Sequence, residues 1–247
     1  MLRAASPRRR VLTLLAHHTS ASSDALLRGH DPVQIDMMRE ELIRVTPADQ
    51  VIGPASKVDC HKVQPDGSIP LHRAFSVFLF DEHNRLLMQQ RSAEKITFPL
   101  VWTNTCCSHP LYTASEMEPR IGIKRAAQRK LWHELGIPAA EVPLSAFEHV
   151  ATIHYKAVCD DGVWGEHEVD HVFAVRVTGA LTLAPNANEV VAVRWFTQAE
   201  LAAFRKTKTA FSPWFARIAA ELLPQWWDEL ERKGTVQTRA TETITCM

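Results

Sequence analysis

Two adjacent cysteines and a histidine occur together in the stretch TNTCCSHP at residues 103–110. Because side chains alternate along an extended chain, Cys107 and His109 would face one side while Cys106 and Ser108 face the other. A thiol beside an imidazole, or beside a cation that the imidazole binds, can have its pKa lowered from about 8.5 and become reactive. Free cysteines are also common as inert, small apolar side chains in protein cores. Taken alone, the stretch favours that second interpretation.

A second polar stretch, GEHEVD at residues 165–170, contains two glutamates two positions apart. On a strand, Glu166 and Glu168 would share one face and His167 would point away. Two neighbouring carboxylates repel each other unless a cation lies between them or one of them keeps its proton. A solvated acidic turn is the alternative interpretation, and this stretch alone does not exclude it.

Histidines elsewhere in the chain could complete a metal site with these carboxylates. The candidate ligands, three nitrogens and at least two oxygens, are His61, His72, His109, Glu166 and Glu168. Such a ligand set suits Zn²⁺, Mn²⁺ or another first-row divalent ion rather than Mg²⁺ alone. The chain has 12 histidines, so the alternative is coincidence, with each histidine an ordinary surface or core residue.

A third stretch, QRKLWHELGI at residues 128–137, resembles the second half of the Nudix box, a motif that binds a metal–diphosphate. Lys130 and His133 replace two of the glutamates expected in that motif, and Glu134 remains. The resemblance implies a Nudix fold but argues against ordinary Nudix hydrolysis. The alternative is a surface helix on which Lys130 and Glu134 form a weak i,i+4 ion pair.

The first half of the chain must position most of these residues. A helix is predicted over about residues 31–42, capped by Asp31. The turn signal Pro-Asp-Gly at 65–67 predicts a hairpin between the segments around His61 and His72. Further predictions are strands over residues 72–80 and 86–90, irregular chain over 92–118, and a helix over about 119–135 that Gly136 ends.

The second half of the chain predicts the remaining sheet and the last helices. Strands are expected near residues 148–157, 167–177 and 190–196. Thr197 and Glu200 form a capping box for a helix over 198–206, and Ser212 is expected to cap the last helix. The predicted fold is therefore an α/β (α+β) sandwich of mixed β-sheets flanked by helices, with helices at its C-terminal end.

Composition excludes several classes of protein. The 28 Lys+Arg residues balance the 28 Asp+Glu residues, so we expect no nucleic-acid partner and no attraction to anionic lipid. No stretch approaches the roughly 18 apolar residues of a membrane-spanning helix. Five cysteines without a CxxC motif argue against a disulfide scaffold or a zinc ribbon and suit a reducing compartment. We expect a monomer or a weak homodimer.

The two ends of the chain differ from its middle. The first 23 residues contain four arginines and no acidic residue. They predict either a transit segment for a mitochondrion or plastid or a tail without consequence. Otherwise we expect the cytoplasm, and the C-terminal sequence makes a peroxisome the weaker alternative. The expected division is an N-terminal extension over 1–30, one domain over 31–233 and a tail over 234–247.

Four sequence blocks together resemble type I isopentenyl-diphosphate delta-isomerase, a Nudix superfamily enzyme, in its long eukaryotic-type form. They are KVDCH (57–61), LHRAFS (71–76), QQRSAEK (89–95) running on to WTNTCCSHP (102–110), and WGEHE (164–168). The segments FSPWF (211–215) and WW (226–227) add a C-terminal signature. This ordered set is far more specific than any single motif. It implies an enzyme that interconverts isopentenyl diphosphate and dimethylallyl diphosphate through a carbocation.

The resemblance also implies roles for individual residues. Cys107 and Glu168 would be the catalytic pair, with Tyr155 linked to Glu168. The tightly bound transition metal, Zn²⁺ or Mn²⁺, would be held by His61, His72, His109, Glu166 and Glu168. The substrate would lie against Lys57, Arg91, Lys95, the Ser108 backbone and the Trp214 ring. Glu134 would hold a second ion, Mg²⁺, that bridges to the diphosphate.

This chemistry explains why such residues would be needed. A carbocation would be trapped by water, so the site must be dry. Trp214 could offer a ring face for cation–π attraction, worth ~2 kcal/mol when desolvated. One rival is a Nudix hydrolase of a nucleotide or other diphosphate, which predicts an intact glutamate-rich box and gives Cys107 no role. The other is a silent binding module, which predicts the loss of Cys107, Glu168 or Glu134.

Overall fold

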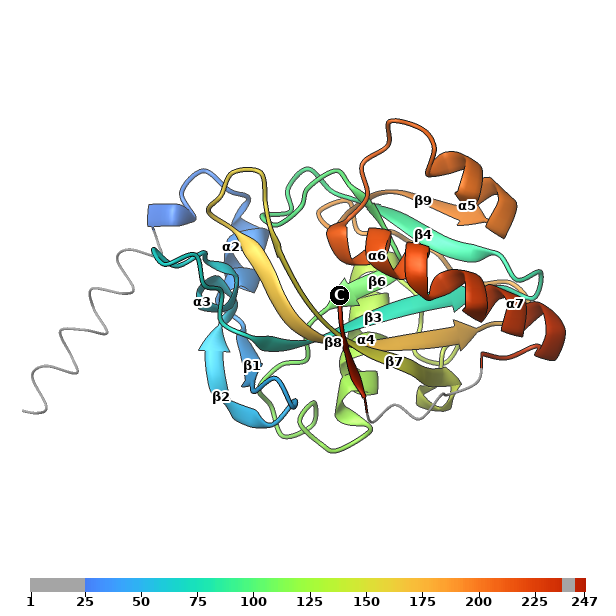
Figure 1. The fold of residues 1–247 in the computed structure, drawn as a ribbon, viewed down its shortest axis with the longest axis horizontal. Helices are drawn as coiled ribbons and strands as arrows, with labels where there is room; N and C mark the ends of the chain where they lie inside the picture. The colour runs from blue at the N-terminus through green and yellow to red at the C-terminus, as the bar shows by residue number, and fades with distance from the viewer. Residues whose placement is uncertain (1–24, 237–242) are drawn as a thin grey trace, which may run out of the picture.

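A mixed β-sheet covered by helices on both faces forms the protein (Figure 1). A computed structural model describes residues 25–236 and 243–247. The strands are β1 (Glu41–Val45), β2 (Val51–Ser56), β3 (His72–Phe80), β4 (Leu86–Arg91), β5 (Trp102–Thr103), β6 (Cys106–Ser108), β7 (Phe147–Val158), β8 (Gly165–Arg176), β9 (Val190–Phe196) and β10 (Ile244–Cys246). The helices are α2 (Pro32–Met38), α3 (Lys57–His61), α4 (Gly122–Leu135), α5 (Gln198–Phe204), α6 (Pro213–Glu221) and α7 (Leu223–Lys233), with a 3-10 turn over Leu144–Ala146. The predicted α/β sandwich is confirmed.

The centre of the sheet joins three long strands in a fixed register. Strands β7 and β8 form an antiparallel pair, and β3 lies parallel to β8. The β3–β8 register sets His72 beside Glu168, and the β7–β8 register sets Tyr155 beside Glu168. Strand β6 pairs with the other edge of β3, opposite Ser76 and its neighbours. Residues far apart in the sequence therefore meet around the first half of β3.

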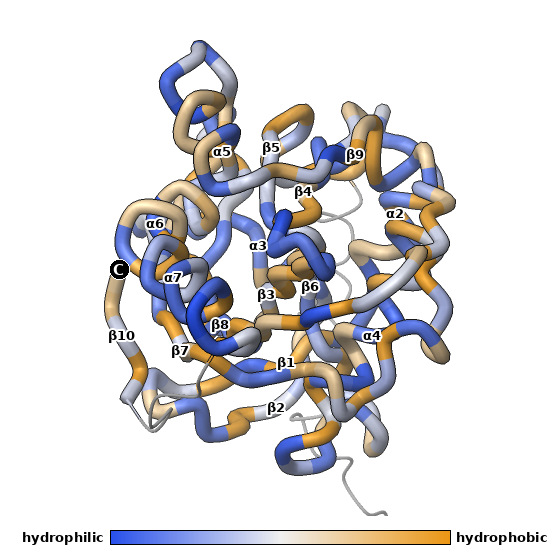
Figure 2. Tube along the Cα trace, turned by 90° about the vertical axis from the view of Figure 1, so that its right-hand side faces the viewer, coloured by the Kyte–Doolittle hydropathy of each residue, from blue (hydrophilic) through white to orange (hydrophobic). Residues whose placement is uncertain are grey.

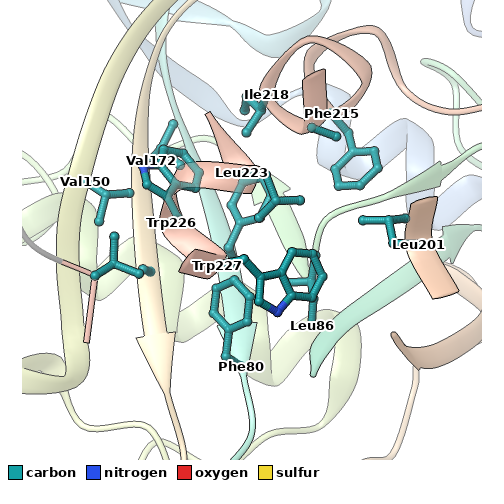
Figure 3. Close-up of a cluster of buried hydrophobic side chains, with 14 of the residues drawn as sticks. Phe80, Leu86, Val150, Val172, Leu201, Phe215, Ile218, Leu223, Trp226 and Trp227 are labelled. Atoms are coloured by element: carbon teal, nitrogen blue, oxygen red, sulfur yellow. The ribbon is translucent and has the colours of Figure 1, made fainter. Parts of the chain in front are cut away.

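Both faces of β3 are buried because its side chains alternate between two cores. Phe78 and Phe80 pack towards α6 and α7, whereas Phe75, Val77 and Leu79 pack towards α4. Figure 3 shows the first core, where the ring of Phe80 lies 5.5 Å from that of Trp227, edge to face. In Figure 2, hydrophilic and hydrophobic residues alternate along α6 and α7, as expected for helices with one buried side.

The predicted hairpin between His61 and His72 is wrong. His61 instead ends the five-residue helix α3, which begins after the N-cap Ser56. The Ser56 hydroxyl accepts a hydrogen bond from the backbone N–H of Asp59, and Asp59 adds a negative charge to the first turn, where the helix dipole favours it. The cap at Ser56 makes the segment before His61 helical. The Pro-Asp-Gly turn at 65–67 lies beyond this helix and does not join two strands.

Other element boundaries differ in detail from the sequence predictions. Helix α2 ends at Met38 and gives way to β1, and the last predicted helix is two helices, α6 and α7. Helix α4 begins at Gly122, three residues later than expected, where a Cβ atom would lie 2.2 Å from the Glu116 carbonyl oxygen. It ends as predicted, with Gly136 left-handed at φ 67°. The capping box of Thr197 and Glu200 is confirmed.

Two expectations about the ends of the chain have different outcomes. The proposed transit segment lies outside the described residues. Within the tail over 234–247, β10 pairs in parallel with β7, so this part of the tail extends the sheet. In the part of the chain that the structure describes, no helix is long and apolar enough to cross a membrane.

A histidine on β7 predicts a pH dependence of stability. The His149 ring stacks on that of His171 at 5.2 Å, and burial together with the charge of His171 lowers the pKa of His149 to about 4. In the unfolded chain its pKa is about 6.5, so the unfolded state binds more protons between these values. The stability that neutral His149 contributes is present above pH 6.5 and is lost as the pH falls to about 4.

We therefore expect His149→Gln to lose less stability than the unchanged protein between pH 7 and pH 5. Protonation of His149 should lower the free energy of unfolding by about 1–2 kcal/mol between these pH values, after a reduction for solvent screening. Urea unfolding at the two pH values measures it. The exposed His83 offers a control, since His83→Gln should leave the pH dependence unchanged. Equal losses in His149→Gln and the unchanged protein would contradict the assignment.

Candidate active site

Three histidines from separate elements meet in a buried cluster. His61 comes from the end of α3, His72 from the start of β3, and His109 from the residue after β6. Their ring centroids lie 4.7 to 4.9 Å from one another. The rings of His61 and His72 are fully buried, and His109 is 7% exposed. Such a close group of buried imidazoles needs a reason beyond packing, because imidazoles are polar.

Hydrogen bonds to carbonyl oxygens orient two of these rings. Nδ1 of His61 lies 2.7 Å from the Lys57 carbonyl oxygen, and Nδ1 of His72 lies 3.0 Å from that of Pro70. Since a carbonyl oxygen only accepts, each Nδ1 carries a proton, and in the neutral ring each Nε2 keeps its lone pair. Both Nε2 atoms are buried and lack a hydrogen-bond partner among the described residues. A backbone carbonyl that accepts from one ring nitrogen and so fixes the orientation of the other is typical of metal-binding histidines.

Two carboxylates from β8 complete the cluster. Glu166 Oε2 lies 2.8 Å from Nε2 of His61, and Glu168 Oε1 lies 2.7 Å from Nε2 of His109. His167 points away, as the alternation along β8 predicts, and its Nδ1 donates to the Ile69 carbonyl oxygen. One ligand atom from each of the five predicted residues lies within 4.8 Å of the others. The solvated-turn interpretation of Glu166 and Glu168 is therefore wrong.

The charges of the cluster fit a divalent cation. Burial lowers the pKa of His61, and burial with the charges of His61 and His72 lowers that of His109 well below its usual value. Neutral imidazoles with free lone pairs are the form that binds metal ions. The two glutamates supply negative charge, and three nitrogens with two oxygens match the preference of first-row divalent ions. The donor set can hold a metal ion.

The two adjacent cysteines lie on opposite faces of β6, as predicted. Cys106 is fully buried and packs in the core beneath α4. Cys107 faces the cavity beside the histidine and glutamate cluster, with its sulfur within 4.8 Å of a Glu168 oxygen. Burial and the charges of Asp170 and Glu168 raise the pKa of Cys107 well above 9. The chain's own side chains therefore favour the thiol, and the expected lowering of its pKa requires a nearby cation.

Aromatic side chains form the apolar wall of the same cavity. The Tyr155 hydroxyl donates a hydrogen bond to Oε2 of Glu168. The ring of Trp214, from the first turn of α6, lies 6.1 Å from that of Tyr155. Trp214 is held by its indole N–H, which donates to Oδ1 of Asn104 at 3.1 Å. These rings offer a dry surface for a hydrocarbon group next to the carboxylate.

Three cations line the opposite part of the cavity, and these are Lys57, Arg91 and Lys95. The guanidinium of Arg91 lies over the Trp214 ring at 5.7 Å and donates to the Phe98 and Thr97 carbonyl oxygens. Burial and the charge of Lys95 lower the pKa of Lys57 to about 8. Because these cations repel one another, an anion between them would be stabilised.

Of the other predicted site residues, Ser108 lines the cavity with Cys107 and His109, whereas Glu134 lies beside it in a buried ion-pair network. Lys130 Nζ is 3.3 Å from Glu134, and Lys95 Nζ is 2.7 Å from Glu189. The interpretation of Lys130 and Glu134 as a surface pair is wrong, since each side chain is only 5% exposed. Although burial opposes it, the charges of Lys95 and Lys130 hold the pKa of Glu189 well below its usual range.

Sequence reasoning missed three residues of the site. Asp170 is fully buried near Cys107, and the alternation along β8 that identified Glu166 and Glu168 would also have placed Asp170 on that face. Ser76, which binds Asp170, reads as an ordinary strand residue. Glu189 comes from a loop, and no local signal links it to Lys95.

Comparisons with known proteins place this fold and site in a class. The NUDIX domain family matches residues 70–215. The crystal structure of DR0079 from Deinococcus radiodurans matches with a TM-score of 0.51, over 73% of this chain and 98% of that one. The two sequences are 16% identical, so the likeness shows a shared fold. The chain is thus a Nudix-fold protein with a buried histidine and glutamate cluster.

Curated relatives narrow the class to one family. The chain is 47% identical over 216 residues to an isopentenyl-diphosphate delta-isomerase of Gibberella zeae, covering 85% of this chain and 84% of the relative. It is 44% identical over 250 residues to the chloroplastic isopentenyl-diphosphate Delta-isomerase I of Arabidopsis thaliana, covering 97% and 84%. The chain belongs to the isopentenyl-diphosphate delta-isomerase family, which confirms the resemblance found in its sequence.

Proposed function

We propose that the chain interconverts isopentenyl diphosphate and dimethylallyl diphosphate, the activity in the names of its relatives. The observation that carries the proposal is that Cys107 and Glu168 share one cavity with three cations and two aromatic rings. The cations Lys57, Arg91 and Lys95 suit a diphosphate. The rings of Tyr155 and Trp214 suit a five-carbon group.

Moving the double bond requires one proton to be added at the terminal CH₂ and another to be removed from C2. We assign the first transfer to Glu168 in its protonated form, whose carboxyl group accepts a hydrogen bond from Tyr155. We assign the second to Cys107, which would accept the proton as a thiolate and lies at the cavity wall on a different strand. The tertiary carbocation between the two transfers is shielded from water by the rings and stabilised by the Trp214 face.

The five-residue cluster would hold a tightly bound divalent transition metal, Zn²⁺ or Mn²⁺. Its ligands would be His61, His72, His109, Glu166 and Glu168. When bound, such an ion stabilises negative charge nearby and so favours deprotonated forms of adjacent groups. A second ion, Mg²⁺, would bind with the substrate diphosphate through Glu134. The residue Ser108 would contribute its backbone N–H to the diphosphate.

Incubating the purified protein with isopentenyl diphosphate and Mg²⁺ tests the function. Proton NMR should show dimethylallyl diphosphate forming until an equilibrium mixture is reached, with the diphosphate intact. In deuterated water, deuterium should enter the terminal methyl group, because the added proton comes from an exchangeable side chain. Release of phosphate with no isomer would favour the rival, a Nudix hydrolase.

For the metal, we expect about one tightly bound transition-metal ion per chain by elemental analysis of protein purified without chelators. His72→Asn should reduce that content severalfold, because it removes a nitrogen whose orientation is fixed for binding. His167→Asn is the matched control, since His167 lies between the two glutamates but points away from the cluster. Metal-free wild-type protein with full activity in Mg²⁺ alone would contradict the transition-metal site.

We also propose that residues 1–23 direct import into a mitochondrion or plastid. Their basic, acid-free composition and the chloroplastic relative support this. Deleting them should abolish import of a fused reporter while leaving turnover and melting temperature nearly unchanged. Import that survives the deletion would exclude the proposal.

A further inference from the structure

A buried aspartate lies behind the proposed catalytic cysteine, and neither the metal cluster nor the diphosphate contacts explain it. Asp170 is fully buried on β8, two positions beyond Glu168 and on the same face of the strand. Its Oδ1 has no hydrogen-bond partner within the described part of the chain. A buried carboxylate oxygen without a partner costs stability. Folding alone therefore gives no reason for an aspartate at this position.

The other carboxylate oxygen of Asp170 has one partner. The Ser76 hydroxyl, also fully buried, donates to Oδ2 of Asp170 at 2.7 Å. Ser76 lies on β3, and the register of the sheet sets it directly opposite Cys107 on β6. The hydrogen bond from Ser76 to Asp170 therefore fixes the orientation of the Ser76 side chain, which lies next to Cys107.

Ser76 and Cys107 are also neighbours across the strand pair. Because they lie directly opposite each other, their side chains share one face of the sheet, and the Cys107 sulfur lies within 4.8 Å of an Asp170 oxygen. A serine hydroxyl has one hydrogen and two lone pairs. When that hydrogen points to Asp170, a lone pair of the Ser76 oxygen is free to accept a hydrogen bond from the Cys107 thiol, so the three side chains can form one chain of hydrogen bonds.

This arrangement addresses a problem of the site. A cysteine side chain has three staggered rotamers, and the small thiol fills too little space for packing alone to select one. Proton transfer needs the sulfur within hydrogen-bond reach of one carbon of the substrate. A misplacement of about 1 Å can lower a rate by roughly 10²-fold. An anchor for the sulfur is therefore of direct value to the reaction.

We propose that Ser76, held in place by Asp170, is a positioning residue that fixes the Cys107 sulfur at the cavity wall. The inference rests on the proposed role of Cys107 and adds to it two residues that act through the cysteine. It requires of Asp170 only that its oxygen accept the Ser76 hydrogen bond.

Steady-state kinetics with isopentenyl diphosphate test the proposal. Ser76→Ala should lower kcat roughly 10- to 100-fold with KM changed less than about twofold, since the diphosphate contacts of Lys57 and Arg91 are untouched. Asp170→Ala should do the same. Asp170→Asn should keep most of the activity, because its amide oxygen still accepts from Ser76 and its volume is unchanged. A fall in Asp170→Asn as large as in Asp170→Ala would overturn the proposal.

The double variant Ser76→Ala/Asp170→Ala shows whether the two residues act through one another. If they do, its kcat should be no lower than that of the slower single variant, because the anchor is already lost. Losses that multiply would overturn the proposal. Thr152→Val is the matched control: it removes a buried hydroxyl that bonds to His149 instead and should leave kcat and KM unchanged.

The failure of this inference is distinguishable from failure of the proposed mechanism. An inactive Cys107→Ala with a normal Ser76→Ala would overturn the anchor alone. Near-normal turnover by Cys107→Ala would overturn the role of Cys107 and the anchor with it. Since Asp170 has an unpartnered oxygen, Asp170→Asn should unfold at a temperature no lower than the unchanged protein.

Discussion

Replacing Cys107 with alanine is expected to lower kcat by roughly 10²- to 10⁴-fold, the range over which a positioned proton-transfer group contributes. The sulfur lies at the cavity wall, and the neighbouring Cys106 cannot substitute for it because it faces the core beneath α4. Binding of the diphosphate should survive, since Lys57 and Arg91 remain. Turnover followed by NMR and substrate binding followed by calorimetry measure the two effects separately.

Cys106→Ala is the matched control for this prediction. It removes the same atoms one position away, from a fully buried side chain. It should cost about 1 kcal/mol of stability and keep most of the activity. Cys107→Ser should leave a weak residual rate, because a hydroxyl fits but is far less acidic than a thiol. Near-normal turnover by Cys107→Ala would reject the two-group proton mechanism.

The site was predicted best where it depends on local alternation. The period of two along residues 103–110 separated Cys106 from Cys107, and the same period along 165–170 separated the glutamates from His167. These assignments need only an extended chain, so they hold before any partner strand is known. The capping box of α5 is likewise local.

Prediction failed where partners distant in sequence decide the structure. Strands β5 and β6 are only two and three residues long, and they are strands because β4 and β3 pair with them. Periodicity cannot reveal such short segments. The burial of Lys130 and Glu134 depends on Glu189 and Lys95 from other parts of the chain, so the helix sequence alone favoured a surface pair.

The histidines show both cases together. Their residue types predicted a metal site, and the structure brings all three within 4.9 Å of one another between ring centroids. The element that carries His61 was nevertheless mistaken for a strand. The ligand set was recognised from chemistry and family resemblance, whereas the route of the backbone to His61 depends on the cap at Ser56. Function was therefore predicted more securely than local conformation.

Glu168→Gln is expected to reduce kcat by roughly 10²- to 10⁴-fold as well. The change keeps the shape of the side chain but removes its ability to carry and release a proton. Although burial raises the pKa of Glu168, the hydrogen bond and charge of His72 outweigh it and leave that pKa below its usual value, so the carboxylate must take up a proton before it can add one to the alkene. Tyr155, which donates to it, can still donate to the amide oxygen.

Because Glu168 is also a proposed metal ligand, the measurement must separate its two roles. Metal content and kcat should be determined on the same preparation of Glu168→Gln. A variant that keeps its metal and loses turnover supports the proton-transfer role, whereas turnover that returns when excess metal is added would assign the loss to ligation. Glu148→Gln, an exposed change on the neighbouring strand β7, should alter neither quantity.

Deuterium from the solvent should enter the substrate's terminal carbon in Cys107→Ser more readily than in Glu168→Gln, because only Cys107→Ser retains the group assigned to that carbon.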